Sequence, residues 1–219
     1  MPIIAIDGPA ASGKGTLARK LARHLDYAYL DTGALYRAVG LLVARAGGDA
    51  DNEQDAVLAA QQLAEADLAK ITSDPEMKSE STGGLASKVA AIPAVRALLL
   101  DFQHQFAASP PGGKAGAVLD GRDIGTVVCP EAEVKLFITA SVETRAKRRF
   151  MEQYGEGGSD EQYLAILRDL IRRDERDTQR ATAPLKAAKN AHLLDTTNSD
   201  IEAVFEMAVT LISDRMTIA

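Results

Sequence analysis

The sequence predicts an α/β fold in which helices cover both faces of a five-stranded parallel sheet, as a single domain over residues 1–219. Five short apolar runs alternate with segments in which apolar residues recur every three or four positions, the pattern of strands alternating with helices. A glycine-rich stretch, GPAASGKGT at 8–16, separates the first apolar run from the first helical segment. With 219 residues, 46% of them apolar, the chain is long enough to bury one sizeable core.

The elements follow in order along the chain. The isoleucine-rich run PIIAID at 2–7 predicts a buried strand, and Leu17, Leu21 and Leu25 beyond the glycine-rich stretch predict a helix. Further strands are predicted over 28–30, 117–120, 134–138 and 192–195. Helices are also predicted over 35–46 and 53–66. Pro93 is expected in the first turn of a helix with the apolar face Val95, Leu98, Leu99, Phe102 and Phe106.

Serine residues mark the starts of the last three helices. Ser141 is expected to cap the helix that follows the fourth strand. Ser159-x-x-Gln162 has the form of a capping box that opens a long charged helix, and Ser199-x-x-Glu202 is expected to open the terminal helix.

Composition excludes several classes of protein. The net charge of −6 argues against nucleic acid as a partner, because such surfaces usually carry a basic excess. The one cysteine, Cys129, forms no intrachain disulfide and is expected to be structural. The start MPIIAID lacks a basic segment, and no apolar run approaches about 18 residues. We therefore expect a soluble cytoplasmic protein with no membrane partner.

The stretch Gly8-x-x-x-x-Gly13-Lys14 lies between a predicted strand and a predicted helix, the context of a phosphate-binding loop. Its glycines allow successive backbone N–H groups to face an anion, and the helix N-terminus adds positive potential. Lys14 supplies a charge for the outer phosphates of a nucleoside triphosphate. Nucleotide-binding switches carry a metal-binding hydroxyl directly after the lysine, whereas this chain has Gly15 there and Thr16 one residue later. This GxxxxGKGT loop resembles that of nucleoside monophosphate kinases, which favours transfer to a small acceptor.

Three more stretches extend the resemblance over nearly the whole chain: DTGALYR (31–37), LDGRDIGTVV (119–128) and RDERDTQRATAPL (173–185). With the loop, they resemble the bacterial-type cytidylate kinases, in the same order. The resemblance implies a P-loop kinase fold with a small nucleotide-binding insert at about 62–107 and a lid at about 151–169. It implies a monomer that uses ATP and Mg²⁺ to convert CMP and dCMP to CDP and dCDP in pyrimidine nucleotide metabolism.

The resemblance also assigns the site residues. The ATP-binding residues would be Gly8, Pro9, Ala10, Ala11, Ser12, Gly13, Lys14, Gly15, Thr16 and Arg148. The CMP-binding residues would be Thr32, Arg37, Ser87, Arg96, Arg122, Asp123, Arg173, Asp177 and Arg180. Catalysis would rest on Lys14, Arg122 and Arg173. No side chain is expected to bind the metal directly, although Thr16 and Asp120 would face it through water.

Without the resemblance, some of these residues also have simpler structural interpretations. Thr32 also fits a helix cap and Arg37 a solvated charge, while Ser87 and Arg96 are unremarkable. Asp123 has a chemical rationale, because a carboxylate accepts from the N4 amino group of cytosine and repels the carbonyl of uracil.

The arginines near the C-terminal half have two interpretations. Taken as helix, Arg173, Asp177 and Arg180 share one stripe. Either Asp177 keeps the two guanidiniums oriented while their other donors face a ligand, or the stripe is a solvated, ion-paired face. On the preceding helix, the candidates for contact with the donor phosphates are Arg145, Arg148 and Arg149, at least one of which is expected to be solvated.

Other functions stay open at this point. The nearest is a P-loop kinase for UMP, AMP or a non-nucleotide acceptor. A nucleotide-binding switch lacks support because the chain has no N-K-x-D motif. The segment 67–86 is shorter than the usual family insert and lacks its strand-turn-strand pattern, which leaves its structure open and keeps a non-catalytic binding module as a third alternative.

Overall fold

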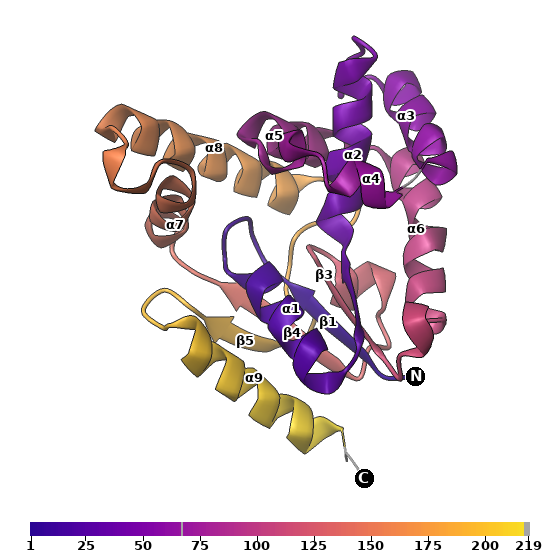
Figure 1. The fold of residues 1–219 in the computed structure, drawn as a ribbon, viewed down its shortest axis with the longest axis vertical. Helices are drawn as coiled ribbons and strands as arrows, with labels where there is room; N and C mark the ends of the chain where they lie inside the picture. Colours follow the sequence, from indigo (N-terminus) through magenta and orange to yellow (C-terminus); the bar gives the residue numbers. More distant parts are fainter. Residues whose placement is uncertain (67, 217–219) are drawn as a thin grey trace.

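A computed structural model describes residues 1–66 and 68–216 of the chain. Parallel strands form one sheet in the order β2-β3-β1-β4-β5 (Figure 1). The strands are β1 (Ile3–Asp7), β2 (Ala28–Asp31), β3 (Ala117–Gly121), β4 (Val134–Thr139) and β5 (His192–Asp195). Every predicted strand is therefore confirmed, within one residue at either end.

Helices connect the strands. The α-helices are α1 (Lys14–Leu25), α2 (Thr32–Arg45), α3 (Glu53–Glu65), α4 (Leu68–Thr72), α5 (Glu80–Val89), α6 (Pro93–Ala108), α7 (Val142–Tyr154), α8 (Asp160–Gln179) and α9 (Ile201–Arg215). Shorter helical turns are η1 (Pro75–Lys78), η2 (Pro111–Gly113), η3 (Ile124–Val128) and η4 (Gly155–Gly157). Within the described ranges, no helix has both the length and the apolar character needed to cross a membrane.

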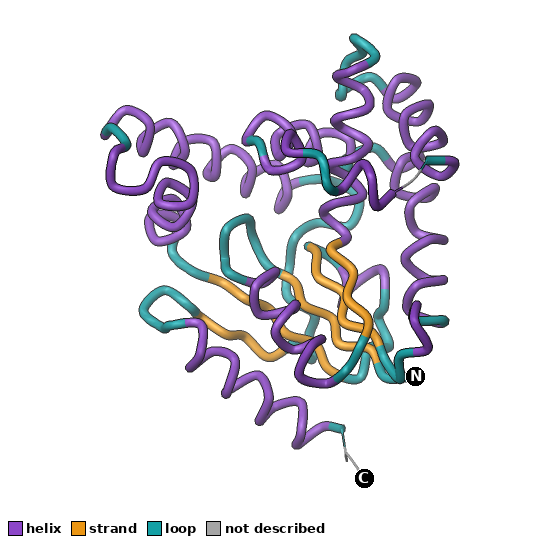
Figure 2. Tube along the Cα trace, in the orientation of Figure 1, coloured by secondary structure: helices purple, strands orange, loops and turns teal. Residues whose placement is uncertain are grey.

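The helices form layers on both faces of the sheet, which confirms the three-layer α/β/α arrangement (Figure 2). Side chains alternate between the two faces along a strand. Accordingly, Ile4 and Ile6 of β1 pack with α1 and α9, whereas Ala5 packs with α6 and η3. Ile4, Ala5 and Ile6 are completely buried. The sheet therefore fixes the carboxyl ends of β1 and β3 side by side.

Two of the three predicted caps are confirmed. The Ser141 hydroxyl accepts from the backbone N–H of residue 144, and Ser159 forms a full capping box with Gln162. The prediction for Ser199 is wrong, because Asp200 caps α9 by accepting from the N–H of Ala203. Ser199 and Asp200 are adjacent, and serine and aspartate are about equally good N-cap residues, so the local pattern does not decide which of the two caps the helix.

The predicted apolar face of α6 is only partly correct. Leu98 and Phe102 are 42% and 40% exposed. The buried stripe is instead Val95, Leu99, Gln103 and Ala107, together with Arg96. Gln103 is tolerated inside because its side-chain amide donates to the carbonyl oxygen of Leu99.

Between α2 and β3 the described residues form helices joined by turns and short loops, also in the part whose structure the sequence left open. This segment has its own apolar core, in which α3, α5 and α6 pack against α2 (Figure 1). The closest approach is at Gly40 of α2, where an added Cβ atom would lie 2.8 Å from the Cβ atom of Leu85 on α5. This helical block stands beside α8, above the carboxyl ends of the strands (Figure 1).

Candidate active site

The glycine-rich loop follows β1 and leads into α1, as the sequence predicts. Gly8 has a φ of 153°, and a Cβ atom there would lie 2.0 Å from the carbonyl oxygen of Ile138 on β4, so only glycine fits. Gly13 and Ala11 also have positive φ, at 89° and 58°. The Lys14 amino group folds back to donate to the carbonyl oxygen of Pro9 at 3.3 Å. The loop is therefore already shaped as a nest for an anion.

Lys14 sits in a strongly cationic environment. Burial lowers its pKa to about 7, and the nearby guanidiniums of Arg122 and Arg173 add to the effect, while Asp120 and Asp31 oppose it. Burial likewise lowers the pKa of Arg173 to about 10, with Arg122 as the next cause. The Arg173 Nε atom is buried and has no hydrogen-bond partner among the described residues. Three cationic groups thus lie close together, one of them with a donor that no described residue uses, which suits a polyanionic ligand.

Two carboxylates lie opposite the lysine, at the ends of neighbouring strands. Asp31 of β2 and Asp120 of β3 are paired in register. Burial, and next the charge of Asp31, raise the pKa of Asp120 to about 6. The Tyr29 hydroxyl donates to Asp120 Oδ1 at 3.3 Å. This pair of close carboxylates is a favourable place for a cation.

Asp120 also explains the glycine after Lys14. A Cβ atom at Gly15 would lie 3.1 Å from Asp120 Oδ2, so the bare backbone leaves room for the carboxylate. Thr16 is exposed and borders a different cavity from the one that Asp120 lines. The two residues predicted to face a metal through water therefore do not share a cavity, and the geometry favours Asp120.

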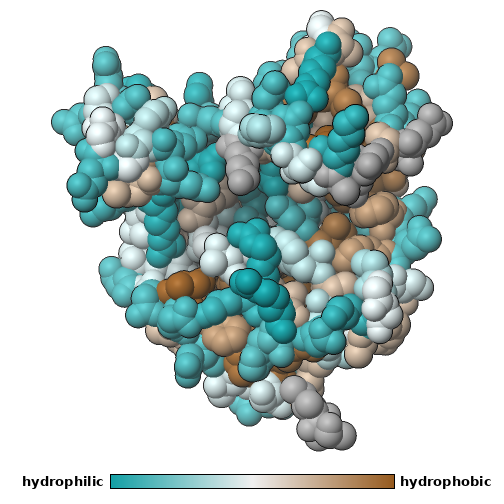
Figure 3. All heavy atoms as spheres, in the orientation of Figure 1, coloured by the Kyte–Doolittle hydropathy of each residue, from teal (hydrophilic) through white to brown (hydrophobic). Residues whose placement is uncertain are grey.

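A large cavity of about 850 Å³ lies between the glycine loop and the helical block. The space-filling view shows the surface hollowed below α5 and α8, with hydrophilic residues around the hollow (Figure 3). All nine residues predicted to bind the acceptor line this cavity: Thr32, Arg37, Ser87, Arg96, Arg122, Asp123, Arg173, Asp177 and Arg180. Positions from almost 150 residues of chain thus converge on one site.

Asp123 lies deep in this cavity between two arginines. It forms an ion pair with Arg96, and the Arg180 Nη2 atom lies 3.5 Å from its other oxygen. The side chains of all three are at most 8% exposed. The pKa of Asp123 is nevertheless raised, because burial outweighs the attraction of the two guanidiniums. We refer to these three residues as the buried triad.

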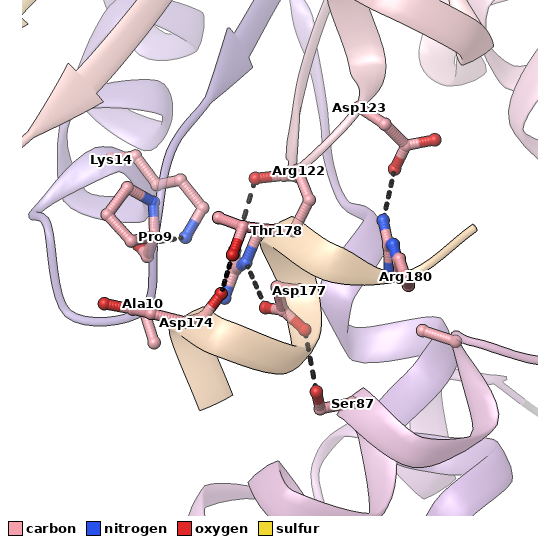
Figure 4. Close-up of polar contacts among 12 residues, drawn as sticks. Pro9, Ala10, Lys14, Ser87, Arg122, Asp123, Asp174, Asp177, Thr178 and Arg180 are labelled. Atoms are coloured by element: carbon pink, nitrogen blue, oxygen red, sulfur yellow. Dashed lines mark hydrogen bonds and ion pairs between the residues drawn. The ribbon is translucent and has the colours of Figure 1, made fainter. Parts of the chain in front are cut away.

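Asp177 organises the neighbouring wall of the cavity. Its carboxylate accepts from the Ser87 hydroxyl of α5 at 2.7 Å and from Arg122 Nε at 3.1 Å (Figure 4). Although burial raises the pKa of Asp177, Arg122, Arg173 and the Ser87 hydrogen bond hold it below its usual range. Asp177 therefore links the helical block to the loop after β3.

The predicted stripe of Arg173, Asp177 and Arg180 on one helix is wrong in part. Helix α8 ends at Gln179, and Arg180 has an extended conformation with φ −60° and ψ 140°. The Arg180 Nε atom donates to the carbonyl oxygen of Ala183, and its guanidinium turns to Asp123. The carboxylate partner expected for Arg173 and Arg180 instead bonds Arg122 and Ser87.

The two predicted acceptor residues on α2 are held by different partners, Arg37 by Asp31 and Thr32 by Asp120. The Asp31 carboxylate caps α2 by accepting from the N–H of Ala34, and it pairs with Arg37 at 2.6 Å. Thr32 is not the cap: its hydroxyl donates to the carbonyl oxygen of Asp120 at 2.8 Å. The interpretation of Arg37 as a merely solvated charge is also wrong, since it is ion-paired at the cavity wall.

The three arginines of α7 have separate roles. Arg145 is 4% exposed and donates to the carbonyl oxygens of Ala140 and Ala10 and to Asp174, so its donors are used within the protein. Arg148 borders a second cavity of about 300 Å³, together with Thr16 of the glycine loop region. Arg149 lines the large cavity. Of the three, Arg145 does not fit the predicted contact with a donor phosphate.

Several residues of the site were not singled out from the sequence. They are Asp7 at the end of β1, Asp31 and Tyr29 on β2, and Arg19, which lies over the Tyr29 ring. Asp7 ends a predicted strand and Asp31 directly follows one, at the edge where ligands of open α/β sheets bind. That position was the available signal, whereas nothing local marks Tyr29 or Arg19.

Comparisons with known proteins agree on one family. The family model described as cytidylate kinase matches residues 4–214. The chain is 56% identical over 213 residues to the cytidylate kinase of Paramagnetospirillum magneticum, covering 97% of this chain and 98% of that protein. It is 53% identical to the cytidylate kinase of Rhodospirillum rubrum, with the same coverage.

Solved structures add a similarity of fold. An uncharacterized protein from Eubacterium ventriosum has a TM-score of 0.52 at 16% identity, over 98% of this chain and 99% of that chain. A sugar kinase from Janibacter has a TM-score of 0.50 at 15% identity, over 97% of this chain and 95% of that chain. At these identities, the likeness bears on the fold alone.

Proposed function

The chain belongs to the cytidylate kinase family, and from that premise we propose that it transfers the terminal phosphate of ATP to CMP, giving ADP and CDP. We extend the proposal to dCMP as a second acceptor in pyrimidine nucleotide metabolism. The observation that carries the proposal is that the glycine loop borders two cavities, of about 300 Å³ and 850 Å³. A phosphate held by the loop is thereby exposed to an acceptor in the larger cavity.

The donor would bind across the loop. The backbone N–H groups of the loop and Lys14 would hold the outer phosphates, and the smaller cavity would take the nucleoside part. Arg148 fits this assignment because it borders that cavity and is anchored by two donations to Thr196. Its guanidinium is therefore already fixed in place before ATP binds.

The acceptor would lie in the larger cavity with its phosphate toward Lys14. Arg37 and Arg122 supply forked donors that suit a phosphate. The buried triad would recognise the base, with Asp123 accepting from the amino group of cytosine and Arg96 donating to its ring acceptors. Asp177 and Ser87 would lie at the sugar. A triad of fixed charges, rather than an apolar slot, accounts for selection of one pyrimidine over another.

Catalysis would be positioning plus electrostatic stabilisation. An oxygen of the CMP phosphate forms a bond to the γ-phosphorus of ATP, the bond from that phosphorus to the β–γ bridging oxygen breaks, and ADP leaves with the electron pair. Lys14, Arg122 and Arg173 all line the larger cavity, where they would surround the transferred group and neutralise its charge. The Nε atom of Arg173 is a donor that no described residue uses.

The residues present also fit Mg²⁺. Asp120 and Asp31 place carboxylate oxygens beside the loop, and Asp120, whose pKa is raised mainly by burial and then by the charge of Asp31, forms no ion pair among the described residues, which supports a cation next to it. Mg²⁺ held there would supply positive charge that offsets the charge of the donor phosphates. We assign Asp120 to a contact through water, supported by its position next to Gly15.

The test is ADP release with ATP, Mg²⁺ and one of CMP, dCMP, UMP, AMP or shikimate, alongside the variant Lys14→Ala. We expect turnover with CMP and dCMP and its loss in the variant. Turnover with another acceptor alone would keep the loop and overturn the assignment of the buried triad. Normal turnover in Lys14→Ala would overturn the assignment of the loop.

A further inference from the structure

A buried carboxylate joins the donor side of the site to the acceptor side. Asp7 is the last residue of β1, directly before the glycine loop, and it is 4% exposed. Its Oδ1 atom accepts from the backbone N–H of Ile124 at 2.7 Å, and its Oδ2 atom accepts from that of Gly125 at 2.8 Å. These bonds reach 117 and 118 residues along the chain.

Burying this carboxylate is costly. Burial raises its pKa to about 7, the charge of Asp123 adds to the rise, and Lys14 opposes it only weakly. No basic side chain among the described residues forms an ion pair with Asp7. The two backbone N–H groups are therefore its main compensation. An apolar residue would fill this position without such a cost, so the reason for the carboxylate lies in what it holds.

What it holds is the turn η3, directly after Arg122 and Asp123. The Asp123 carbonyl oxygen accepts from the N–H groups of Val127 and Val128, at 2.8 and 3.2 Å. The backbone of Asp123 is thus part of the turn, and a shift of the turn would move the two side chains that line the large cavity.

We propose that Asp7 is a positioning residue, which fixes the Arg122–Asp123 loop relative to the glycine loop and so sets the distance between acceptor and donor. The proposal rests on the proposed function of Arg122 and Asp123. Asp7 would act by positioning other residues, because it does not itself line either cavity. A few tenths of an ångström matter here, since transfer needs the reacting atoms aligned and about 3–3.5 Å apart.

The chain contains its own reporter of this turn. Cys129, the one cysteine of the sequence, donates from its backbone N–H to the carbonyl oxygen of Ile124 at 2.7 Å and so closes the turn. Its thiol is buried, and burial raises its pKa to about 11, with Asp7 as the next cause. Reaction of this thiol with a disulfide reagent therefore requires the turn to open.

The experiment compares Asp7→Ala, Asp7→Asn and, as a control, Ile212→Ala on α9. Ile212 is 1% exposed and packs in the core between α9 and the sheet, so its variant loses stability without touching η3. Each variant is assayed for thiol reaction rate, for KM and kcat with CMP, and for ATP affinity by equilibrium titration. Asp7→Asn removes the same charge as Asp7→Ala but keeps one oxygen that accepts a hydrogen bond.

We expect thiol reaction in Asp7→Ala to rise about tenfold or more, with a smaller rise in Asp7→Asn. The KM for CMP should rise and kcat fall in the same order, about tenfold in Asp7→Ala, while ATP affinity stays within about threefold. Ile212→Ala should leave KM and ATP affinity near wild type. If Asp7→Ala does not fold, Asp7→Asn alone must show both changes.

Several outcomes would overturn the proposal. Equal thiol rates in the Ala and Asn variants would mean that loss of charge near the thiol explains both. An equal loss of ATP and CMP binding would mean that Asp7 supports the glycine loop only. The thiol rate does not depend on turnover, so a wild-type protein inactive on CMP would reject the proposed function while the thiol result still decides whether Asp7 holds the turn.

Discussion

Replacement of Asp123 by asparagine tests the buried triad with a change of only one charge and almost no volume. The substitution leaves Arg96 and Arg180 buried with their shared counter-ion gone. The raised pKa of Asp123 means that burial costs the charged carboxylate more than the two guanidiniums return, so a neutral amide recovers part of what their lost counter-charge costs. The typical cost of removing one partner of a buried ion pair is therefore an upper limit for this variant.

Removing one partner of a buried ion pair typically costs about 3–5 kcal/mol in the free energy of unfolding. For a chain of this length, that corresponds to a fall in Tm of about 6–20 °C. The side chains involved are at most 8% exposed, so solvent screening reduces the cost little. The side-chain amide of asparagine can also donate a hydrogen bond to the carbonyl that uracil carries in place of the cytosine amino group. The preference for CMP over UMP in kcat/KM should therefore fall by about tenfold or more.

Urea unfolding and steady-state kinetics with CMP and UMP check these values, with ATP affinity as a third measurement that should not change. Asp74→Asn is the matched control, because Asp74 also pairs with an arginine but on the surface, and asparagine can still cap η1. The reasoning would be refuted if Asp123→Asn were as stable as Asp74→Asn and discriminated against UMP as strongly as the wild type.

Three further predictions concern other parts of the site. Because the pKa of Lys14 in the free protein is about 7, ATP binding should take up about half a proton at pH 7 and nearly one at pH 8, and affinity should fall as pH rises. Calorimetry in buffers of different ionisation enthalpy measures this uptake, and Lys14→Arg should abolish it; uptake that persists would be contrary to the assignment. Gly40→Ala should lower the free energy of unfolding by about 1–3 kcal/mol, because the added methyl group clashes with Leu85. Gly84→Ala, which has open space around it, is the control and should not lower it. Equal effects of the two substitutions in denaturant titration would refute this prediction. Arg148→Ala should raise the KM for ATP by about tenfold and leave that for CMP unchanged, and the opposite pattern in steady-state kinetics would place Arg148 on the acceptor side.

The parts of the fold that depend on local pattern were predictable. The strand of β1, the glycine loop and the leucines of α1 lie in one continuous stretch, and both the helix and the loop are fixed by residues within it. The capping box at Ser159 is local in the same way. These features need no knowledge of the rest of the chain.

The parts that failed depend on contacts between distant segments. Arg180 leaves the helix because its guanidinium is held by Asp123, 57 residues away, and by the turn at Ala183. Gln103 can lie in the buried stripe of α6 because its side-chain amide donates a hydrogen bond to a carbonyl oxygen on the preceding turn of the helix. A hydropathy pattern contains no information about this bond. The role of Asp7 rests on two bonds to backbone atoms, and backbone donors carry no mark in the sequence.

The residues of the acceptor site were predicted as a set because the resemblance to a family supplied them, but their partners were not. Sequence spacing suggested that Asp177 holds Arg173 and Arg180, whereas the structure joins it to Arg122 and Ser87. Which donor meets which carboxylate is decided by how α8 lies against α5 and the loop after β3, a property of the whole fold.

The most direct test of the central claim follows the fate of the terminal phosphate. ATP labelled in its γ-phosphate is incubated with the protein, Mg²⁺ and an equimolar mixture of CMP and UMP, and the products are separated. We predict that the label appears in CDP, with little in UDP or in inorganic phosphate. Label found mainly in inorganic phosphate would contradict transfer, and label found equally in UDP would contradict recognition of cytosine by Asp123.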